Sequence, residues 1–531
     1  MTPPIDLEPL REEIEQHFAT HSHEQLIKWL ADEHGTVVPK RTLIRRLKKW
    51  GLVHREAALN PTALESISFL FHTTTDNDDD IAATLTAQGI LISGRQVKRA
   101  RLSQGWRRRN RLPEQQEEQR RTTAEAVANA LASGGRNYGR NYMSTALRLE
   151  GHKARFHDIA HELQRQDPES ASRRKPGKGN RQRRTEFINP GPDHLWCIDG
   201  HDKLVPWGIH IYAAVDAFSR RIMWVYVGNA NRARIAVARQ YLQTVDALDW
   251  CPRFIRADKG QEAVLLADAH LRLFLDHRHT LGDDQSTLDT LPVADCFFFG
   301  ASTANQRMEN WWLRLRCGQL EWWIVYFRYL ESNGFFVSGQ VADTVVLLFV
   351  FMPIIRQEVH QFVQIWNSHR IRKQRGLANH IPGIPNKLYD QRSSSGERFG
   401  FQPNQEILDE LLHHTDDFDY DAYLVPDTIA WLEQQLEDIF HQFGNVSRIE
   451  SSDFRRGKTP IVPQYYRILL TRARQHSGLL QLAPKPSPES GLGWNELAVT
   501  QVVMETMNNG VDSGGRAAVD MEAVTEPVVV E

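Results

Sequence analysis

The segments between residues 194 and 309 restrict the fold of this chain most strongly. Three strand-like stretches follow one another closely: HLWCID (194–199), GIHIYAAVDAF (208–218) and RRIMWVYVG (220–228). Each is apolar and contains β-branched or aromatic residues, and the turn before the third is short enough for a hairpin. The pattern then alternates. Helices are predicted at 233–248, at 262–275 and from about Thr303, and strands at 253–258 and 296–300.

The resulting order, β-β-β-α-β-α-β-α, predicts an α/β domain with a mixed five-stranded sheet and helices on its faces. This is the plan of ribonuclease H-like folds. Further along, the apolar run VVLLFVFMPII (345–355) contains Pro353 and is too short to cross a bilayer, so a buried helix is expected and no membrane partner.

Three carboxylates fall at places that this topology brings together. Asp199 ends the first predicted strand, Asp258 ends the strand that lies beside it, and Glu309 lies on a helix packed near both ends. Carboxylates that converge repel one another unless a divalent cation neutralises them, and Mg²⁺ (or Mn²⁺) is the cation that such oxygen ligands favour. Two such ions would clamp the attacking and leaving oxygens of a phosphodiester displacement.

Other polar residues nearby have simpler interpretations. Asp202 sits beyond the strand end, Asp216 precedes a turn that it can cap, and Glu262 opens a helix, where it favours the dipole. His201 and Lys259 either touch phosphate or are exposed to solvent.

The helix that carries Glu309 has one further candidate residue. Asn305 lies four residues before Glu309 on the same helix face, and it either orients Glu309 or contacts DNA. Trp311 and Trp312 fall on other faces of the helix, where core packing is expected.

Before residue 170, three segments share a helix-turn-helix pattern. In the first two, 24–52 and 80–106, Gly89 and Gly105 each lie 54 positions after their counterparts Gly35 and Gly51, although Leu47 corresponds to Arg101. The third, 138–168, repeats the plan loosely around Gly151. Residues 110–121 are predicted to be a polar connector.

The second helices of the first two segments are basic, although the formal net charge of the chain is only −2. Such a helix enters the major groove of DNA in helix-turn-helix proteins. The alternative is a helical bundle with solvated basic faces. The residues predicted to bind DNA are Arg41, Arg45, Arg95, Lys98 and Arg99, and Arg46, Lys48 and Arg101 lie beside them.

A basic linker, SASRRKPGKGNRQRRT (170–185), separates these segments from the sheet domain. It cannot form a core, and Arg173, Arg174 and Lys175 are expected to follow DNA phosphates, to serve as a nuclear import signal, or simply to be solvated. We therefore expect a nuclear location.

The quoted motifs also carry a resemblance. WCIDGHDKL, DAFSRR, RADKGQE and STANQRMENWW resemble the integrase core domain of retroviral integrases and insertion-sequence transposases, and the similarity is greatest to eukaryotic, fungal-type members. It extends over about 130–395. It implies an Asp-Asp-Glu metal site at Asp199, Asp258 and Glu309, and cleavage and transfer of DNA strands at element ends into target DNA by a homo-oligomer.

The predicted domains follow from these patterns. They are tandem helix-turn-helix repeats (1–110), a third such segment (122–169), the basic linker (170–189), the catalytic core (190–395), a helical region (396–483) and a disordered tail (484–531). The separation of Asp258 and Glu309 is longer than in many family members, and the polar loop 277–295 accounts for the surplus as a surface insertion or a mispredicted exon.

Two rival functions remain open at this point. One is a catalytically silent or host-adopted DNA-binding protein derived from a transposon, and the presence of all three carboxylates argues against it. The other is a nuclease acting on RNA–DNA hybrids, which the DNA-binding repeats disfavour.

Overall fold

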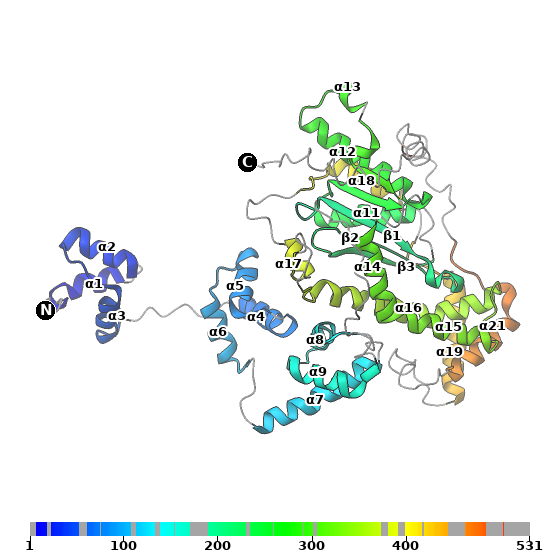
Figure 1. Ribbon diagram of the computed structural model, residues 1–531, viewed down its shortest axis with the longest axis horizontal. Helices are drawn as coiled ribbons and strands as arrows, with labels where there is room; N and C mark the ends of the chain where they lie inside the picture. Colours follow the sequence, from blue (N-terminus) through cyan, green and yellow to red (C-terminus); the bar gives the residue numbers. More distant parts are fainter. Residues whose placement is uncertain are drawn as a thin grey trace, which may run out of the picture. The chain divides into compact units, whose positions relative to one another are not determined.

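The computed structural model forms two compact units, which we describe separately: residues 1–71 with 76–107, and residues 72–75 with 108–531 (Figure 1). The structure describes residues 7–18, 23–52, 61–74, 76–107, 113–132, 138–152, 154–169, 189–229, 234–258, 260–289, 291–300, 305–372, 381–390, 399–416, 419–443, 462–484 and 503.

The N-terminal region contains two groups of three helices, each with its own core. The helices of the first are α1 (Arg11–Phe18), α2 (His23–His34) and α3 (Lys40–Lys49), and those of the second are α4 (Pro61–Thr73), α5 (Asp78–Ala87) and α6 (Gly94–Ser103). Leu43 and Val97, which correspond across the repeat, are both fully buried. The two groups thus repeat the same order of helices around two separate cores.

Glycines end the repeated helices as the repeat predicts. Gly35 and Gly89 have φ of +60° and +85°, a conformation that costs glycine little, and the amide of the next residue donates to a carbonyl of the preceding helix. The broken match at Arg101 also has a physical reason. Arg101 is buried and forms a two-pronged ion pair with Asp78, with N–O distances of 2.7 and 2.9 Å. Arg101 therefore belongs to the core and not to the exposed basic face that the sequence suggested.

The third helical group belongs to the larger unit. It consists of α7 (Pro113–Ala132), α8 (Arg140–Leu149) and α9 (Phe156–Gln166), with Gly151 at φ +83° after α8. Tyr142 of α8 packs against Phe362, with ring centroids 5.7 Å apart. The prediction of a polar connector at 110–121 is wrong from residue 113 onward, because α7 begins at Pro113, which is favourable in the first helical turn.

The central sheet has five strands in the order β3-β2-β1-β4-β5. They are β1 (Leu195–His201), β2 (His210–Asp216), β3 (Ile222–Gly228), β4 (Phe254–Asp258) and β5 (Phe297–Gly300). β1, β2 and β3 are antiparallel neighbours, and β4 and β5 run parallel to β1. The predicted mixed sheet is confirmed. β1 does not end at Asp199, however, because Gly200 and His201 continue its pairing with Tyr212 and Ile211.

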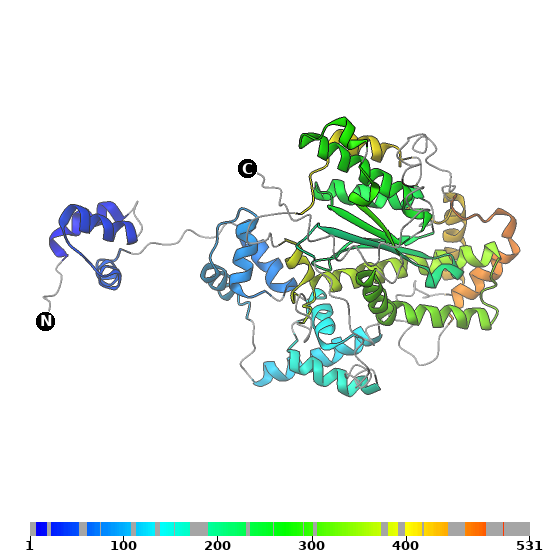
Figure 2. The ribbon, with the colours of Figure 1, turned by 45° about the horizontal axis from the view of Figure 1, so that its top comes forward.

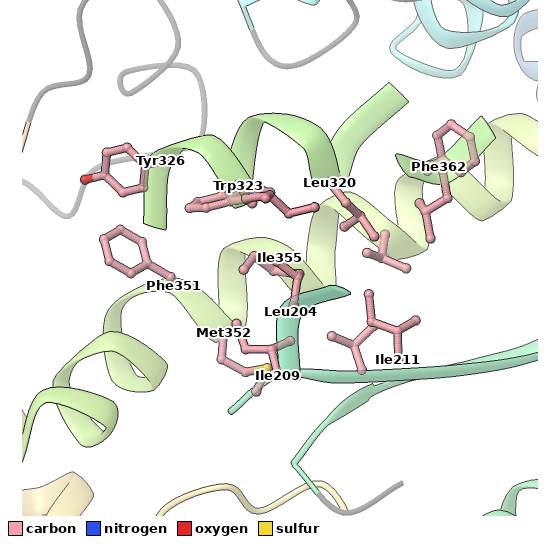
Figure 3. Close-up of a cluster of buried hydrophobic side chains, with 14 of the residues drawn as sticks. Leu204, Ile209, Ile211, Leu320, Trp323, Tyr326, Phe351, Met352, Ile355 and Phe362 are labelled. Carbon is pink, nitrogen blue, oxygen red and sulfur yellow. The ribbon is translucent and has the colours of Figure 1, made fainter. Parts of the chain in front are cut away.

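Helices cover both faces of the sheet (Figure 1 and Figure 2). One face packs on α11 (Arg234–Leu248) and α12 (Val264–Thr280), and the other on α14 (Gln306–Leu315), α15 (Glu321–Ser332) and α16 (Val341–Ser368). Figure 3 shows part of the second core, where Ile209, just before β2, lies against Met352 and Trp323 faces Ile355. The predicted buried helix around Pro353 is thus the middle of α16.

The predicted polar loop between 277 and 295 is only partly a loop. α12 continues to Thr280, α13 (Gln285–Leu288) follows, and a 3-10 turn spans Val293–Asp295. Leu288 and Val293 are buried. The segment therefore packs on the domain through two apolar anchors, which its polar composition obscured.

The long helix α16 also closes the free edge of the sheet at β3. The amide of Asn367 pairs with both backbone groups of Ile222, at 2.8 and 3.0 Å. Arg356 donates from Nε to the carbonyl of Val227 at 2.7 Å. Side chains of one helix thus satisfy backbone groups that an edge strand leaves unpaired.

The region after the core is helical, as predicted. It comprises α18 (Gln405–His413), α19 (Pro426–Phe443) and α21 (Gln464–Gln475), while α17 (Pro385–Asp390) still lies within the predicted core. Leu408 packs with the α11–α12 side of the sheet, and Arg474 pairs with the buried Asp343 of α16 at 2.6 Å. The predicted tail lies outside the described residues from 485 onward, except for Val503. Among the helices that the structure describes, none has the length and apolar character needed to span a membrane.

Candidate functional site

Asp199 occupies the middle of the site. It lies on β1 opposite Ala213 of β2, and only 8% of its surface is exposed. Its Oδ1 accepts a hydrogen bond from the amide of Gly200 at 2.9 Å, and its Oδ2 accepts one from the indole Nε1 of Trp312 at 2.9 Å. The carboxylate is therefore held from both sides by donors on the protein.

Asp258 ends β4, the strand beside β1. The last paired residues are Cys197 and Arg256, and Asp199 and Asp258 each follow two positions later. The amide of Gly260 donates to Oδ1 of Asp258 at 3.2 Å. A Cβ at position 260 would lie 2.3 Å from a carboxylate oxygen of Glu262, so a larger residue there would require the Glu262 side chain to move.

Glu309 lies in the first turn of α14 and is exposed. Asn305, just before this helix, donates from Nδ2 to the carbonyl of Ile198 at 3.0 Å. This bond attaches the start of α14 to β1 one residue before Asp199. Asn305 itself is buried, and within the described residues its Oδ1 has no hydrogen-bond partner.

The electrostatics link carboxylates from three elements. The pKa of Asp199 is raised to about 7, chiefly by burial and also by the negative charges of Asp258 and, to a smaller extent, Glu309, while the two hydrogen bonds act to lower it. A carboxylate surrounded in this way is stabilised by a nearby positive charge. Among the residues that the structure describes, however, no three His, Cys, Asp or Glu side chains are arranged to hold a metal ion.

Trp312 connects Asp199 to His201. Its ring stacks on the imidazole of His201, with centroids 4.9 Å apart and planes inclined by 18°. His201 is buried, and burial lowers its pKa to about 4, so it is neutral near pH 7. Of the two alternatives given for His201, contact with phosphate or exposure to solvent, the second is therefore wrong. The expectation of core packing holds for Trp311, whereas Trp312 both packs in the core and binds the candidate catalytic carboxylate.

Tyr212 is a second residue that the sequence did not indicate. It lies on β2 opposite Gly200 and is almost fully buried. Burial raises its pKa well above the usual value, and the charges of Glu262, Asp258 and Asp199 add to this effect. Within the described residues its hydroxyl has no hydrogen-bond partner. An aromatic residue in a strand gives no sign in the sequence that its hydroxyl lies near these carboxylates.

The remaining acidic residues behave as their simpler interpretations predict. Asp216 is fully buried, and its carboxylate accepts bonds from the amide and hydroxyl of Ser219 at 2.7 and 2.6 Å, so it caps the turn. Asp202 is exposed at the start of a 3-10 turn, and Glu262 lies in the 3-10 turn before α12. Lys259 lies outside the described residues.

The residues predicted to bind DNA are exposed wherever the structure describes them. These are Arg41 and Arg45 on α3, and Arg95, Lys98 and Arg99 on α6. The basic linker, with Arg173, Arg174 and Lys175, lies outside the described residues.

The strand order, the mixed directions of the strands and the helices on both faces define a ribonuclease H-like domain. Residues 187–393 match the family model described as "Integrase core domain". Residues 3–54 match a second model, described as "Clr5 domain". Residues 187–393 thus form an integrase core domain, a member of the polynucleotidyl transferase superfamily. No curated protein was found to match the chain.

Proposed function

We propose that this protein is a divalent-metal-dependent DNA integrase or transposase in which Asp199, Asp258 and Glu309 form the catalytic site. The observation that carries the proposal is the electrostatic effect of Asp258 and Glu309 on the buried Asp199. They come from β1, β4 and α14, and both partners raise the pKa of the buried Asp199. Such convergence within an integrase core domain favours an active site over three unrelated surface acids.

The donor set fits Mg²⁺ or Mn²⁺. All three candidate ligands are carboxylates, which hard divalent cations prefer, and none of the four cysteines is among them. When bound, the metal would supply positive charge for attack at, and departure from, a DNA phosphate. Asp258 is half-buried and Glu309 exposed, so both side chains have room to turn toward the ion.

The protein's own contribution is to position these ligands. Gly200 and Trp312 fix the plane of the Asp199 carboxylate, yet each oxygen keeps a second lone pair for a ligand. Asn305 fixes the start of the helix that carries Glu309. We also propose that the exposed basic residues of α3 and α6 bind DNA, that the protein acts on element ends and target DNA as a homo-oligomer, and that it works in the nucleus.

Strand transfer by the purified full chain tests the proposal. The DNA that flanks the gene is first searched for terminal inverted repeats. The substrate is a duplex that ends in such a repeat, with a plasmid as target, and Mg²⁺ or Mn²⁺ is added. Asp199→Asn, Asp258→Asn and Glu309→Gln should each lower the rate by roughly 10³-fold or more, because each removes charge that holds the cation. Binding of the same duplex should persist.

Asp202→Asn provides a matched control. It makes the same chemical change three residues from Asp199, at an exposed position. It should leave strand transfer within about twofold of the wild type, the effect expected of a surface change of no more than ~0.5 kcal/mol. Wild-type activity in the Asp199, Asp258 and Glu309 variants would exclude the assignment of the site, and DNA binding without strand transfer in the wild type would favour a silent DNA-binding protein.

A further inference from the structure

Two exposed apolar side chains occupy equivalent positions in the two N-terminal three-helix groups. Val37 is 77% exposed and Leu91 is 88% exposed, more than any other large apolar side chain in the described part of the chain. Each follows a left-handed glycine, Gly35 or Gly89, by two residues. The same offset of 54 positions separates the valine from the leucine and one glycine from the other.

Packing does not explain these two side chains. The next residue in each turn, Val38 or Ile92, is buried and supplies the apolar contact to the core. A single exposed leucine or valine is ordinary on a protein surface. Val37 and Leu91, however, are the two most exposed of these side chains and occupy the same position in the repeat. This recurrence indicates that each contacts another molecule rather than its own three-helix group.

The adjoining helix faces show what kind of molecule makes that contact. Residues spaced by three, four and seven lie on one face of a helix. On α3 this face consists of Arg41, Ile44, Arg45 and Lys48, and on α6 it consists of Arg95, Lys98, Arg99 and Leu102; all eight residues are exposed. Neither helix carries an acidic residue. A basic surface of this kind suits a polyanion.

We propose that these two faces, together with Val37 and Leu91, read base edges in the DNA major groove. Residues 3–54 and residues 61–107 are then two DNA-reading modules in the same chain. This deepens the DNA-binding part of the proposed function and rests on it. Arginine donates two bonds to guanine, and apolar side chains contact the thymine methyl group. The arginines at 41 and 95, and at 45 and 99, correspond. The modules therefore read short sites that contain both guanine and thymine.

The two sites should be related but not identical. At two positions of the shared face the modules exchange an apolar residue for a basic one: Ile44 corresponds to Lys98, and Lys48 corresponds to Leu102. Because an apolar contact favours thymine and a cation favours guanine or phosphate, each module has its own preference at these places. The preferred DNA then contains two similar but distinguishable half-sites.

Removal of single methyl groups from the DNA tests this proposal without altering the protein. Binding sites are first selected from random duplexes with the full chain. Each thymine in the selected duplex is then replaced by deoxyuridine, which lacks only the methyl group. Loss of one contacted methyl should weaken binding by about fourfold, which corresponds to ~0.8 kcal/mol for a buried CH₂-sized group. At least one thymine in each half-site should show the effect.

Substitution of the turn residues completes the test. In Val37→Ser the effect of deoxyuridine should disappear in one half-site, and in Leu91→Ser it should disappear in the other. Both residues are exposed, so the thermal denaturation temperature should not change. Equal binding of thymine and deoxyuridine duplexes by the wild type, or an effect that survives both substitutions, would overturn the proposal. If Val37 and Leu91 instead contact another protein, the wild type should bind thymine and deoxyuridine duplexes equally, which also overturns the proposal.

Arg95→Ala and Arg107→Ala separate base reading from simple charge. Both residues are exposed and both variants lose one positive charge, but Arg107 follows α6 and does not lie on its reading face. Arg95→Ala should relax the preference at one guanine, and Arg107→Ala should weaken binding equally for all sequences. Metal-dependent strand transfer by the wild-type protein on the inverted-repeat duplex reports the catalytic core independently, so failure of this proposal is distinguishable from failure of the proposed function.

Discussion

Asp199 of β1 and Asp216 of β2 are both buried aspartates on neighbouring strands, and burial raises the pKa of each. Their surroundings differ. Asp216 accepts bonds from the local turn, through Ser219, and from the amide of Asp193, while the charge of Asp193 disfavours its ionisation. Asp199 accepts a bond from a tryptophan 113 residues away, and the acids that act on it stand on other elements.

The difference shows why a raised pKa alone does not identify a catalytic acid. At Asp216 the hydrogen bonds close a turn, and the carboxylate is enclosed by the structure that it stabilises. At Asp199 the neighbours include the half-buried Asp258 and the exposed Glu309, which leave a route to solvent. A buried acid becomes a candidate site when further acids converge on it from separate segments and some of them remain accessible.

Asparagine at each position should have opposite consequences. Asp216→Asn keeps the shape of the side chain but places an NH₂ group opposite buried hydrogen-bond donors. We expect this to lower the free energy of unfolding by about 1–3 kcal/mol. We expect a lower denaturation temperature, with strand transfer by the folded protein retained. Asp199→Asn should show the reverse, a small change in denaturation temperature and loss of strand transfer. Thermal denaturation and the strand-transfer rate, measured on both variants, check the comparison; equal profiles would contradict it.

The bond from Trp312 to Asp199 should contribute to the rate. Trp312→Phe keeps an aromatic ring but removes the indole donor, and a hydrogen bond to a charged group is worth roughly 1.5–3 kcal/mol. Strand transfer should fall by roughly 10- to 100-fold. Trp311→Phe is the control, since Trp311 is fully buried next to it and does not bind the carboxylate. If both variants lose the same activity, Trp312 acts through packing alone.

Divalent metal should change the pH dependence of stability through Asp199 and not through Asp216. The Asp199 carboxyl ionises near pH 3.8 when unfolded and near 7 in the folded chain, so the unfolded state binds fewer protons between these values. Its contribution to the free energy of unfolding therefore falls as pH rises from about 4 to 7. A bound cation offsets this loss, because it favours the ionised carboxylate.

Mg²⁺ should accordingly raise the denaturation temperature at pH 8 more than at pH 5. The shift should persist in Asp216→Asn and shrink in Asp199→Asn. Denaturation scans of the wild type and both variants at the two pH values, with Mg²⁺ or with a chelator, measure it. An undiminished shift in Asp199→Asn would place the metal elsewhere.

Local pattern was enough to predict the five strands and that the strands carrying Asp199 and Asp258 are neighbours. The ends of the strands were harder to predict. β1 continues to His201 because His201 pairs with Ile211, and the sequence alone does not indicate this contact. The start of α7 was missed because residues 113–121 are polar on every face, and a helix of that kind lacks an apolar period.

The supporting residues of the site were the least predictable. Trp312 and Trp311 are identical neighbours in sequence, and only the tertiary structure decides which indole meets Asp199. The unusual role of Arg101 could be recognised in the sequence, because Arg101 occupies the repeat position at which the first segment has Leu47. Its partner Asp78 could have been sought as a compensating acid, because a buried arginine requires one.

The closed edge of β3 limits how copies of this protein can join. Strand-to-strand addition at Ile222 would first have to displace both hydrogen bonds from Asn367, and at Val227 the bond from Arg356. The side chains of α16 thus hinder the growth of one continuous sheet through successive molecules at this edge.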